Sequence, residues 1–238
     1  MAALATGGPN VDVSLLHDVN ALARHVPAAV DRAVVLASSY GIPLLMLLLV
    51  LWCWHGARRQ EPAAAAETFA ALLWAPLAAA IALAANVPLR QLVGRERPFR
   101  THEGLHVLEP AASQSLYSFV SDHATLTMAL GIGLFLARRR VGLVGIGLAL
   151  AEGLSRVYIG AHYPTDVIGG FALGTAVVLV LAPLAMAALT PAVRAVARSP
   201  RAARLVRGRH LARPRPVELG GERAAVGGGL TRDSDLAA

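Results

Sequence analysis

The chain of 238 residues contains no lysine, one cysteine and few charged side chains. Only 16% of its residues are charged, against roughly a quarter in an average soluble domain. With 55% hydrophobic residues and a mean hydropathy of +0.54, this composition excludes an ordinary soluble protein. The single cysteine, Cys53, lies in an apolar run and excludes an intrachain disulfide. We therefore expect an all-α, polytopic membrane protein.

Five apolar segments are long enough to cross a bilayer, which requires about 20 residues in a helix. They cover residues 33–54, 64–89, 117–137, 141–158 and 164–189. Residues 1–32 place apolar positions at helical spacing between charged ones, which predicts an amphipathic helix at the membrane surface. Residues 191–238 are rich in Arg, Pro and Gly, and we expect a disordered cytoplasmic tail. The predicted fold is a membrane helical bundle, its membrane domain spanning residues 33–190.

The distribution of arginine predicts how the bundle is oriented. Arg58 and Arg59, Arg138 to Arg140 and the C-terminal tail lie on one side of the predicted spans. Short loops rich in basic residues stay in the cytoplasm. The opposite ends of the spans should therefore lie on the outer face of a bacterial plasma membrane.

Three polar clusters lie at that outer face. They are Arg90 with Arg97-Pro98, Ser121-Asp122-His123, and Ser155-Arg156 with His162 and Asp166. Ionisable residues near a membrane boundary are costly unless they are paired or functional. Because independent helix caps and basic loops need not converge on one face, the coincidence favours a joint site.

The third cluster has the residue types that phosphate chemistry needs. Arg156 offers a rigid pair of donors suited to phosphate oxygens. His162 can act as a nucleophile if one ring nitrogen is free and the other is held, and the carboxylate of Asp166, four residues later, can hold it. The alternative interpretation is a helix N-terminus that carries Asp because of its dipole.

The other two clusters each allow two interpretations. Ser121 and the free N–H groups at a helix start can bind an anion, and His123 can protonate a leaving oxygen. Alternatively, Ser121 or Asp122 only caps the helix. Arg90 and Arg97 bracket a loop whose guanidinium groups favour a polyanion, or that loop simply faces lipid headgroups.

Together the clusters resemble the signature of the type-2 phosphatidic acid phosphatase superfamily, which reads K-x6-R-P, P-S-G-H and S-R-x5-H-x3-D. The resemblance extends from Pro88 to Gly170. It implies that His162 forms a phosphohistidine, that Asp166 orients it and that His123 protonates the leaving group. We expect the remaining residues at these positions to bind the phosphate of the substrate: Arg90, Arg97, Ser121, Asp122 and Arg156.

Three positions depart from the signature, because Arg90 replaces Lys, Val120 replaces Pro and Asp122 replaces Gly. The positive charge survives at position 90. A carboxylate at position 122 is unfavourable near a phosphate unless it pairs with an Arg or caps the helix. The sequence Ser-Asp-His-Ala-Thr from Ser121, and Arg-Val-Tyr from Arg156, resemble the bacitracin-resistance branch of undecaprenyl-diphosphate phosphatases.

This resemblance implies a lipid phosphatase of cell wall biogenesis that converts undecaprenyl diphosphate to undecaprenyl phosphate and phosphate. The alternatives are another lipid phosphate (phosphatidic acid, phosphatidylglycerol phosphate or another polyprenyl phosphate), a vanadate-dependent peroxidase, and a non-catalytic lipid-phosphate-binding protein. Five membrane spans disfavour the peroxidase, and the intact His123, His162 and Asp166 disfavour the non-catalytic protein. The expected partners are the membrane lipid substrate and the bilayer, without nucleic acid. No metal or other cofactor is expected, because His102 and His106 lack a clear third ligand.

Overall fold

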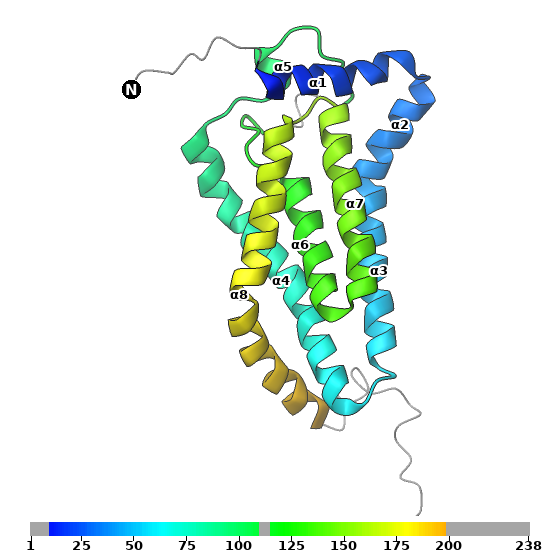
Figure 1. Cartoon of the computed structure of the whole chain (residues 1–238), viewed down its shortest axis with the longest axis vertical. Coiled ribbons are helices and arrows are strands. Elements are labelled where there is room, and N and C mark those ends of the chain that lie inside the picture. Colours follow the sequence, from blue (N-terminus) through cyan, green and yellow to red (C-terminus); the bar gives the residue numbers. More distant parts are fainter. Residues whose placement is uncertain (1–9, 110–114, 199–238) are drawn as a thin grey trace, which may run out of the picture. The chain divides into compact units, whose positions relative to one another are not determined.

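The computed structural model describes residues 10–109 and 115–198, and every regular element in these ranges is a helix. Figure 1 shows these helices in order along the chain. They are α1 (Val11–Ala21), the 3₁₀-helix η1 (Leu22–His25), α2 (Ala28–Leu36), the π-helix η2 (Ala37–Gly41), α3 (Ile42–Ala57), α4 (Pro62–Val93), α5 (Pro98–Thr101), α6 (Asp122–Ala137), α7 (Arg139–Tyr158) and α8 (Pro164–Arg198). The predicted all-α membrane bundle is confirmed.

Four helices in the described residues are long and apolar enough to cross a membrane: α2 to α3 as one continuous helix, α4, α7 and α8. The remaining predicted span, residues 117–137, corresponds to α6, which has only 16 residues. At about 1.5 Å per residue, α6 is shorter than the hydrocarbon core. It packs against α4, α7 and α8 at the centre of the bundle. Helix α6 starts at Asp122, not at the predicted Tyr117, because the preceding segment is tied to the loop before it: the Ser118 N–H donates to the Arg95 carbonyl at 2.8 Å.

Two other predicted boundaries are also wrong. The first span starts at Ala28, directly after Pro27, and not at Ala33. Helix α8 continues past the predicted end at Leu189 to Arg198, because Val193 is buried in the core and Arg194 lies 3.6 Å from Glu67 of α4. The first eight residues of the predicted tail are therefore helical, and the rest of it lies outside the described residues.

Close contact between helices requires glycine at several positions, two of which lie where α6 meets α4 and α7. A Cβ atom on Gly133 of α6 would overlap Ala75 of α4, and one on Gly142 of α7 would overlap the backbone of Phe135 of α6. Without a hydrophobic driving force in lipid, such close backbone approach is a main source of helix association. These glycines let α6 pack closely against α4 and α7.

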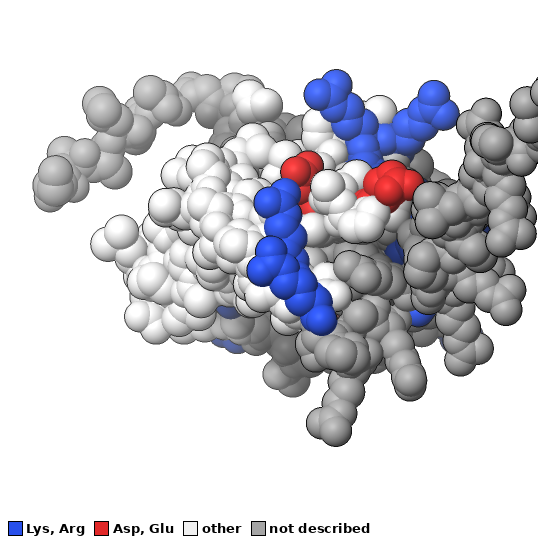
Figure 2. All heavy atoms as spheres, turned by 90° about the horizontal axis from the view of Figure 1, so that it is seen from below, with Lys and Arg blue, Asp and Glu red and all other residues white. Residues whose placement is uncertain are grey.

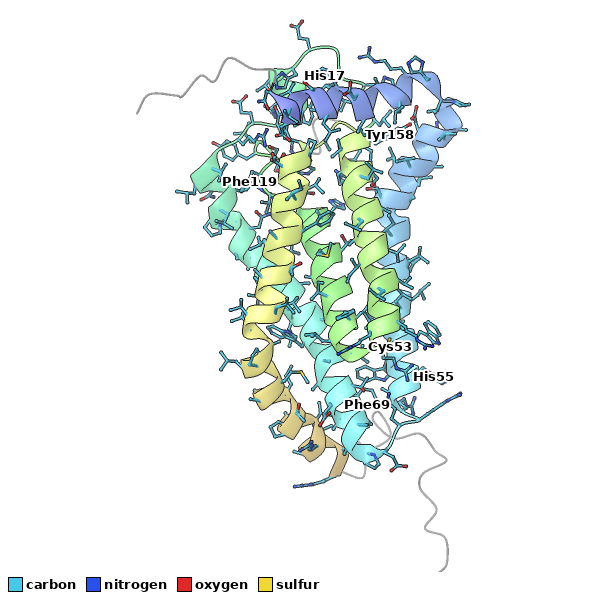
Figure 3. All side chains as sticks on the ribbon, in the orientation of Figure 1. His17, Cys53, His55, Phe69, Phe119 and Tyr158 are labelled. Carbon is cyan, nitrogen blue, oxygen red and sulfur yellow. The ribbon has the colours of Figure 1, made fainter. Side chains whose placement is uncertain are left out.

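Helix α1 lies across one end of the bundle (Figure 1). Its Leu16 and Asn20 are buried. The Asn20 amide donates to the carbonyls of His106 and Tyr158 at 2.9 and 2.8 Å, and accepts the His106 N–H at 2.7 Å. The Tyr158 hydroxyl, labelled in Figure 3, donates to Asp31 of α2 at 2.7 Å. The Asn20 bonds attach α1 to the loop before α6 and to the end of α7, and the Tyr158 bond attaches α7 to α2.

The opposite end of the bundle carries the short turns between α3 and α4 and between α6 and α7. Figure 2 views the molecule from this end and shows arginine side chains projecting there. Arg58 and Arg59 occupy the first turn, Arg138 separates α6 from α7, and Arg139 and Arg140 begin α7. Nearby, the rings of Trp54 and Phe69 pack edge-on with centroids 4.8 Å apart. The arginine-rich turns and the predicted site are thus at different ends of the helices.

Candidate active site

The polar clusters surround one cavity of about 560 Å³ at the α1 end of the bundle. It is lined by Val35, Ser39, Tyr40, Arg90, Arg97, Glu109, Ser115, Asp122, His123, Arg156 and His162. Six of the eight predicted site residues are in this set, and they come from α4, the following loop, α6, α7 and the α7–α8 turn. Ser121 and Asp166 do not line the cavity but support residues that do.

His162 occupies the turn between α7 and α8 and is only 2% exposed. Its Nδ1 lies 2.9 Å from the carbonyl oxygen of Ser118. Because a carbonyl only accepts, Nδ1 carries the proton and Nε2 keeps its lone pair. Burial, together with the charges of Arg97 and Arg156, lowers the pKa of His162 to about 4, although Asp166 opposes the shift. The imidazole is therefore neutral near pH 7, with an unprotonated Nε2 whose lone pair faces Arg97.

Asp166 lies in the first turn of α8 and is completely buried. Its Oδ2 accepts the backbone N–H of Tyr163 at 3.0 Å and lies 3.8 Å from Nδ1 of His162. Its Oδ1 accepts a bond from Arg95 at 3.0 Å. The carboxylate therefore holds the turn that carries His162 and contributes negative charge beside the ring, while the shortest contact of Nδ1 is with Ser118.

Arg97 is 4% exposed and makes a dense set of bonds. It donates to the carbonyl of Ser115 at 2.7 Å, to the Ser115 hydroxyl at 2.9 Å and to the carbonyl of Ala161 at 3.0 Å. Its Nη1 lies 3.2 Å from Nε2 of His162. Burial, with Arg156 and Arg90 nearby, lowers the pKa of Arg97 to about 10, so the guanidinium still carries its charge at pH 7. Any group that Nε2 attacks would thus lie beside a cation.

Arg156 projects from α7 into the same cavity and is 2% exposed. Its two terminal nitrogens donate to the two carboxylate oxygens of Glu109 at 2.7 and 2.9 Å. This two-bond geometry is the one arginine uses for phosphate. The Ser39 hydroxyl of η2 donates to the same carboxylate at 3.4 Å. The Glu109 carboxylate therefore occupies the donors that we predicted for the substrate.

Arg90 and Asp122 form an ion pair at 2.6 Å between the end of α4 and the start of α6. Asn86, one turn earlier on α4, donates to Asp122 at 2.6 Å and to the Val120 carbonyl at 3.0 Å, and accepts the Val120 N–H at 3.2 Å. The acidic residue at a signature glycine position is thus neutralised by the arginine at a signature lysine position. Asn86 holds the backbone where the signature has proline.

The start of α6 places His123 on the cavity and Ser121 beneath it. The Ser121 hydroxyl accepts the Ala124 N–H at 3.5 Å as the helix cap, and its backbone N–H donates to the Asp166 carbonyl at 3.1 Å. Helix capping, one of the two interpretations of this cluster, therefore describes the Ser121 side chain. His123 faces the cavity that His162 also lines.

A family model described as the PAP2 superfamily matches residues 71–190. The chain belongs to the PAP2 superfamily. Undecaprenyl-diphosphatase BcrC of Bacillus subtilis (strain 168) is 28% identical over 146 residues, which are 61% of this chain and 69% of that protein. YbjG of Escherichia coli (strain K12), provisionally named an undecaprenyl-diphosphatase, is 30% identical over 168 residues, 69% of this chain and 78% of that protein.

A solved PAP2 structure has the same fold. It is the transmembrane phosphatidylglycerolphosphate phosphatase from Bacillus subtilis, with a TM-score of 0.53, 20% identity, and coverage of 76% of this chain and 88% of that chain. The family model and the two relatives confirm the predicted family, and the protein is a membrane phosphatase of the PAP2 superfamily. At this identity the structural similarity shows the fold alone.

Several residues outside the PAP2 signature shape the cavity. The sequence alone assigned no role to Asn86, Ser118, Ser39 or Glu109. A signal existed for Asn86, since an amide inside an apolar span is costly unless it is bonded. The ring of His102 packs edge-on against the ring of Tyr163, and the two ring centroids are 5.9 Å apart.

Proposed function

We propose that the enzyme hydrolyses undecaprenyl diphosphate to undecaprenyl phosphate and inorganic phosphate on the outer face of the bacterial plasma membrane. The observation that carries this proposal is the single cavity lined by His162, His123 and three arginines. It combines a neutral imidazole nitrogen with the fixed charges that a transferring phosphoryl group requires. The named activity of the BcrC relative supports the choice of lipid.

In the first step, the lone pair on Nε2 of His162 attacks the terminal phosphorus. The P–N bond forms as the bond from phosphorus to the bridging oxygen breaks, and that oxygen leaves with its electron pair on undecaprenyl phosphate. His123 gives a proton to this oxygen where one is needed. Arg97, 3.2 Å from Nε2, together with Arg156 and Arg90 stabilises the charge of the transferring group.

In the second step, a water molecule attacks the phosphorus of the phosphohistidine. The P–N bond breaks, its electron pair returns to Nε2, and inorganic phosphate forms. His123, which has an unprotonated ring nitrogen at this stage, accepts a proton from the attacking water. The Ser118 carbonyl, 2.9 Å from Nδ1, keeps the same tautomer of His162 throughout.

The rim of the cavity supports a lipid substrate. Val35 and Tyr40 line it from the first membrane span, and Tyr40 is 72% exposed. An apolar tail leaving the cavity over these residues would enter the bilayer directly. The arginine-rich turns at the other end of the bundle support an outward-facing site.

The test is phosphate release by purified protein from a panel of undecaprenyl diphosphate, phosphatidic acid and phosphatidylglycerol phosphate. We expect the highest kcat/KM with undecaprenyl diphosphate and no turnover by His162→Ala. Trapping of an acid-labile phosphoenzyme in the wild type, but not in His162→Ala, would assign the nucleophile. A phosphoenzyme that survives in His162→Ala would contradict the mechanism.

The second candidate is the same reaction on another lipid phosphate. The observation that favours it is the position of the charged groups, which all surround the phosphate and leave the tail to apolar residues such as Val35. Such a site binds the phosphate group, which all lipid phosphates share. A higher kcat/KM with phosphatidic acid or phosphatidylglycerol phosphate in the same panel would select this candidate.

A further inference from the structure

Asp12 of the N-terminal helix α1 binds the start of α8. Its carboxylate accepts the Thr165 N–H at 2.9 Å, the Thr165 hydroxyl at 2.6 Å and Arg95 at 2.5 Å. Burial alone would raise the pKa of Asp12, but the bonds from Thr165 and Arg95 outweigh it and lower the pKa. Asp12 is thus a charged anchor between helix α1 and the helix that carries Asp166.

Arg95 lies between two carboxylates. Its Nη2 bonds Asp12, and its Nη1 donates to Asp166 at 3.0 Å and to Thr165 at 2.7 Å. The face of the guanidinium lies 3.6 Å above the centre of the Tyr163 ring, a cation–π contact. The side chain is therefore held at its edge and on one face, and it has little freedom to move.

Asp166 links Arg95 to the turn that carries His162. One of its oxygens bonds Arg95 and the other holds the Tyr163 N–H, directly after His162 in the chain. That second oxygen is 3.8 Å from Nδ1 of His162. A shift of the Asp166 carboxylate would therefore move both the turn and the negative charge beside the ring.

We propose that Asp12 and Arg95 are positioning residues for catalysis, which hold Asp166 and thereby set the position of the His162 ring. The inference rests on the proposed role of His162. Asp12 lies outside the part of the chain that matches the family model, which begins at residue 71. Arg95 occupies one of the variable positions between Arg90 and Arg97. The N-terminal helix thus completes the catalytic centre of this phosphatase.

A merely structural attachment of α1 would give a different result from a positioning role. Loss of attachment lowers the fraction of folded enzyme and the thermal unfolding temperature. Loss of positioning lowers kcat in enzyme that remains folded, since misplacing a reacting group by about 1 Å costs about 100-fold. The phosphate-binding arginines remain in place, so KM should hardly change.

The experiment compares Asp12→Asn and Arg95→Met with two matched controls, Asp18→Asn and Arg100→Met. Asp18 is exposed on the same helix as Asp12, and Arg100 is exposed on the short helix α5, five positions after Arg95. The substrate is whichever lipid of the panel the wild type hydrolyses fastest. We expect kcat to fall by about 10- to 100-fold in Asp12→Asn and Arg95→Met, with KM within about threefold of wild type and both controls unchanged.

Three further measurements complete the test. The rate of phosphoenzyme formation in a single turnover should fall with kcat, and Arg95→Lys should recover part of the loss. The double variant Asp12→Asn/Arg95→Met should lose less than the product of the two single losses, because the residues act in one network. Wild-type kcat in Asp12→Asn, or losses that match the unfolded fraction, would overturn the inference. A wild type that prefers another lipid phosphate would refute the proposed substrate alone.

Discussion

Replacement of Glu109 with Gln should strengthen the binding of phosphate to the cavity. In the structure, both carboxylate oxygens of Glu109 accept bonds from Arg156, at 2.7 and 2.9 Å. Arg156 is 2% exposed and the Glu109 side chain 12%, so water weakens this pair little. A phosphate that binds Arg156 must displace the carboxylate or share the donors with it. Glu109 is therefore an internal competitor of the substrate.

The size of the effect follows from the bonds that must break. A hydrogen bond to a charged group contributes about 1.5–3 kcal/mol, and every 1.4 kcal/mol is a factor of about ten in affinity. An amide at position 109 keeps one acceptor but loses the charge. We therefore expect Glu109→Gln to bind phosphate about 10- to 100-fold more tightly.

The assay is competitive inhibition by inorganic phosphate, a product of the reaction, together with KM for the lipid. Both the inhibition constant and KM should fall in Glu109→Gln. The matched control is Glu103→Gln, the same change at an exposed position of the same loop, which should alter neither constant. Unchanged or weaker phosphate inhibition in Glu109→Gln would show that the carboxylate does not compete for Arg156.

Three further predictions concern the cations, the nucleophile and the packing. Arg90→Lys should keep kcat/KM within about threefold because a point charge can still pair with Asp122, whereas Arg156→Lys should lose about 100-fold because lysine cannot form the two-bond contact; steady-state kinetics of both variants give the comparison. The pKa of His162, lowered to about 4 by burial, keeps Nε2 unprotonated as the pH falls. A pH–rate profile should therefore show the His162 limb near pH 4 and not near 6.5, the ordinary value for histidine. Gly142→Ala should destabilise the protein by about 1–3 kcal/mol through overpacking against α6. Gly147→Ala should leave the stability unchanged, because a Cβ atom there meets nothing within 4 Å. Thermal unfolding in detergent compares the two variants.

The sequence was sufficient for the parts of the site that spacing along a helix determines. Arg156 ends one span, Asp166 begins the next, and His162 lies between them, so their proximity follows from a short turn. Hydropathy located the apolar helices, because each must bury its backbone bonds in lipid. Hydropathy overestimated the length of α6, since Tyr117 to Val120 are apolar or small yet form a non-helical segment that bonds the preceding loop.

Long-range side-chain contacts could not be predicted from the sequence. Asp12 and Thr165 are 153 positions apart, and Asn20 and Tyr158 are 138 apart. No periodicity in the sequence joins them, because each contact depends on where α1 lies across the bundle. The bond of Asp122 to Arg90 is an intermediate case. The unfavourable charge at a signature glycine position required a cationic partner, and the lysine-to-arginine change nearby supplied one.

The ion pairs of the site indicate which arginine the phosphate of a substrate should bind most favourably. Each of three arginines has a carboxylate partner: Arg90 has Asp122, Arg95 has Asp166 and Asp12, and Arg156 has Glu109. Within residues 10–109 and 115–198, Arg97 has none and bonds only neutral acceptors. Because a buried cation without a counter-charge is costly, an anion gains most by binding there. Since Arg97 also contacts Nε2 of His162, the same preference would bring the phosphorus to the nucleophile.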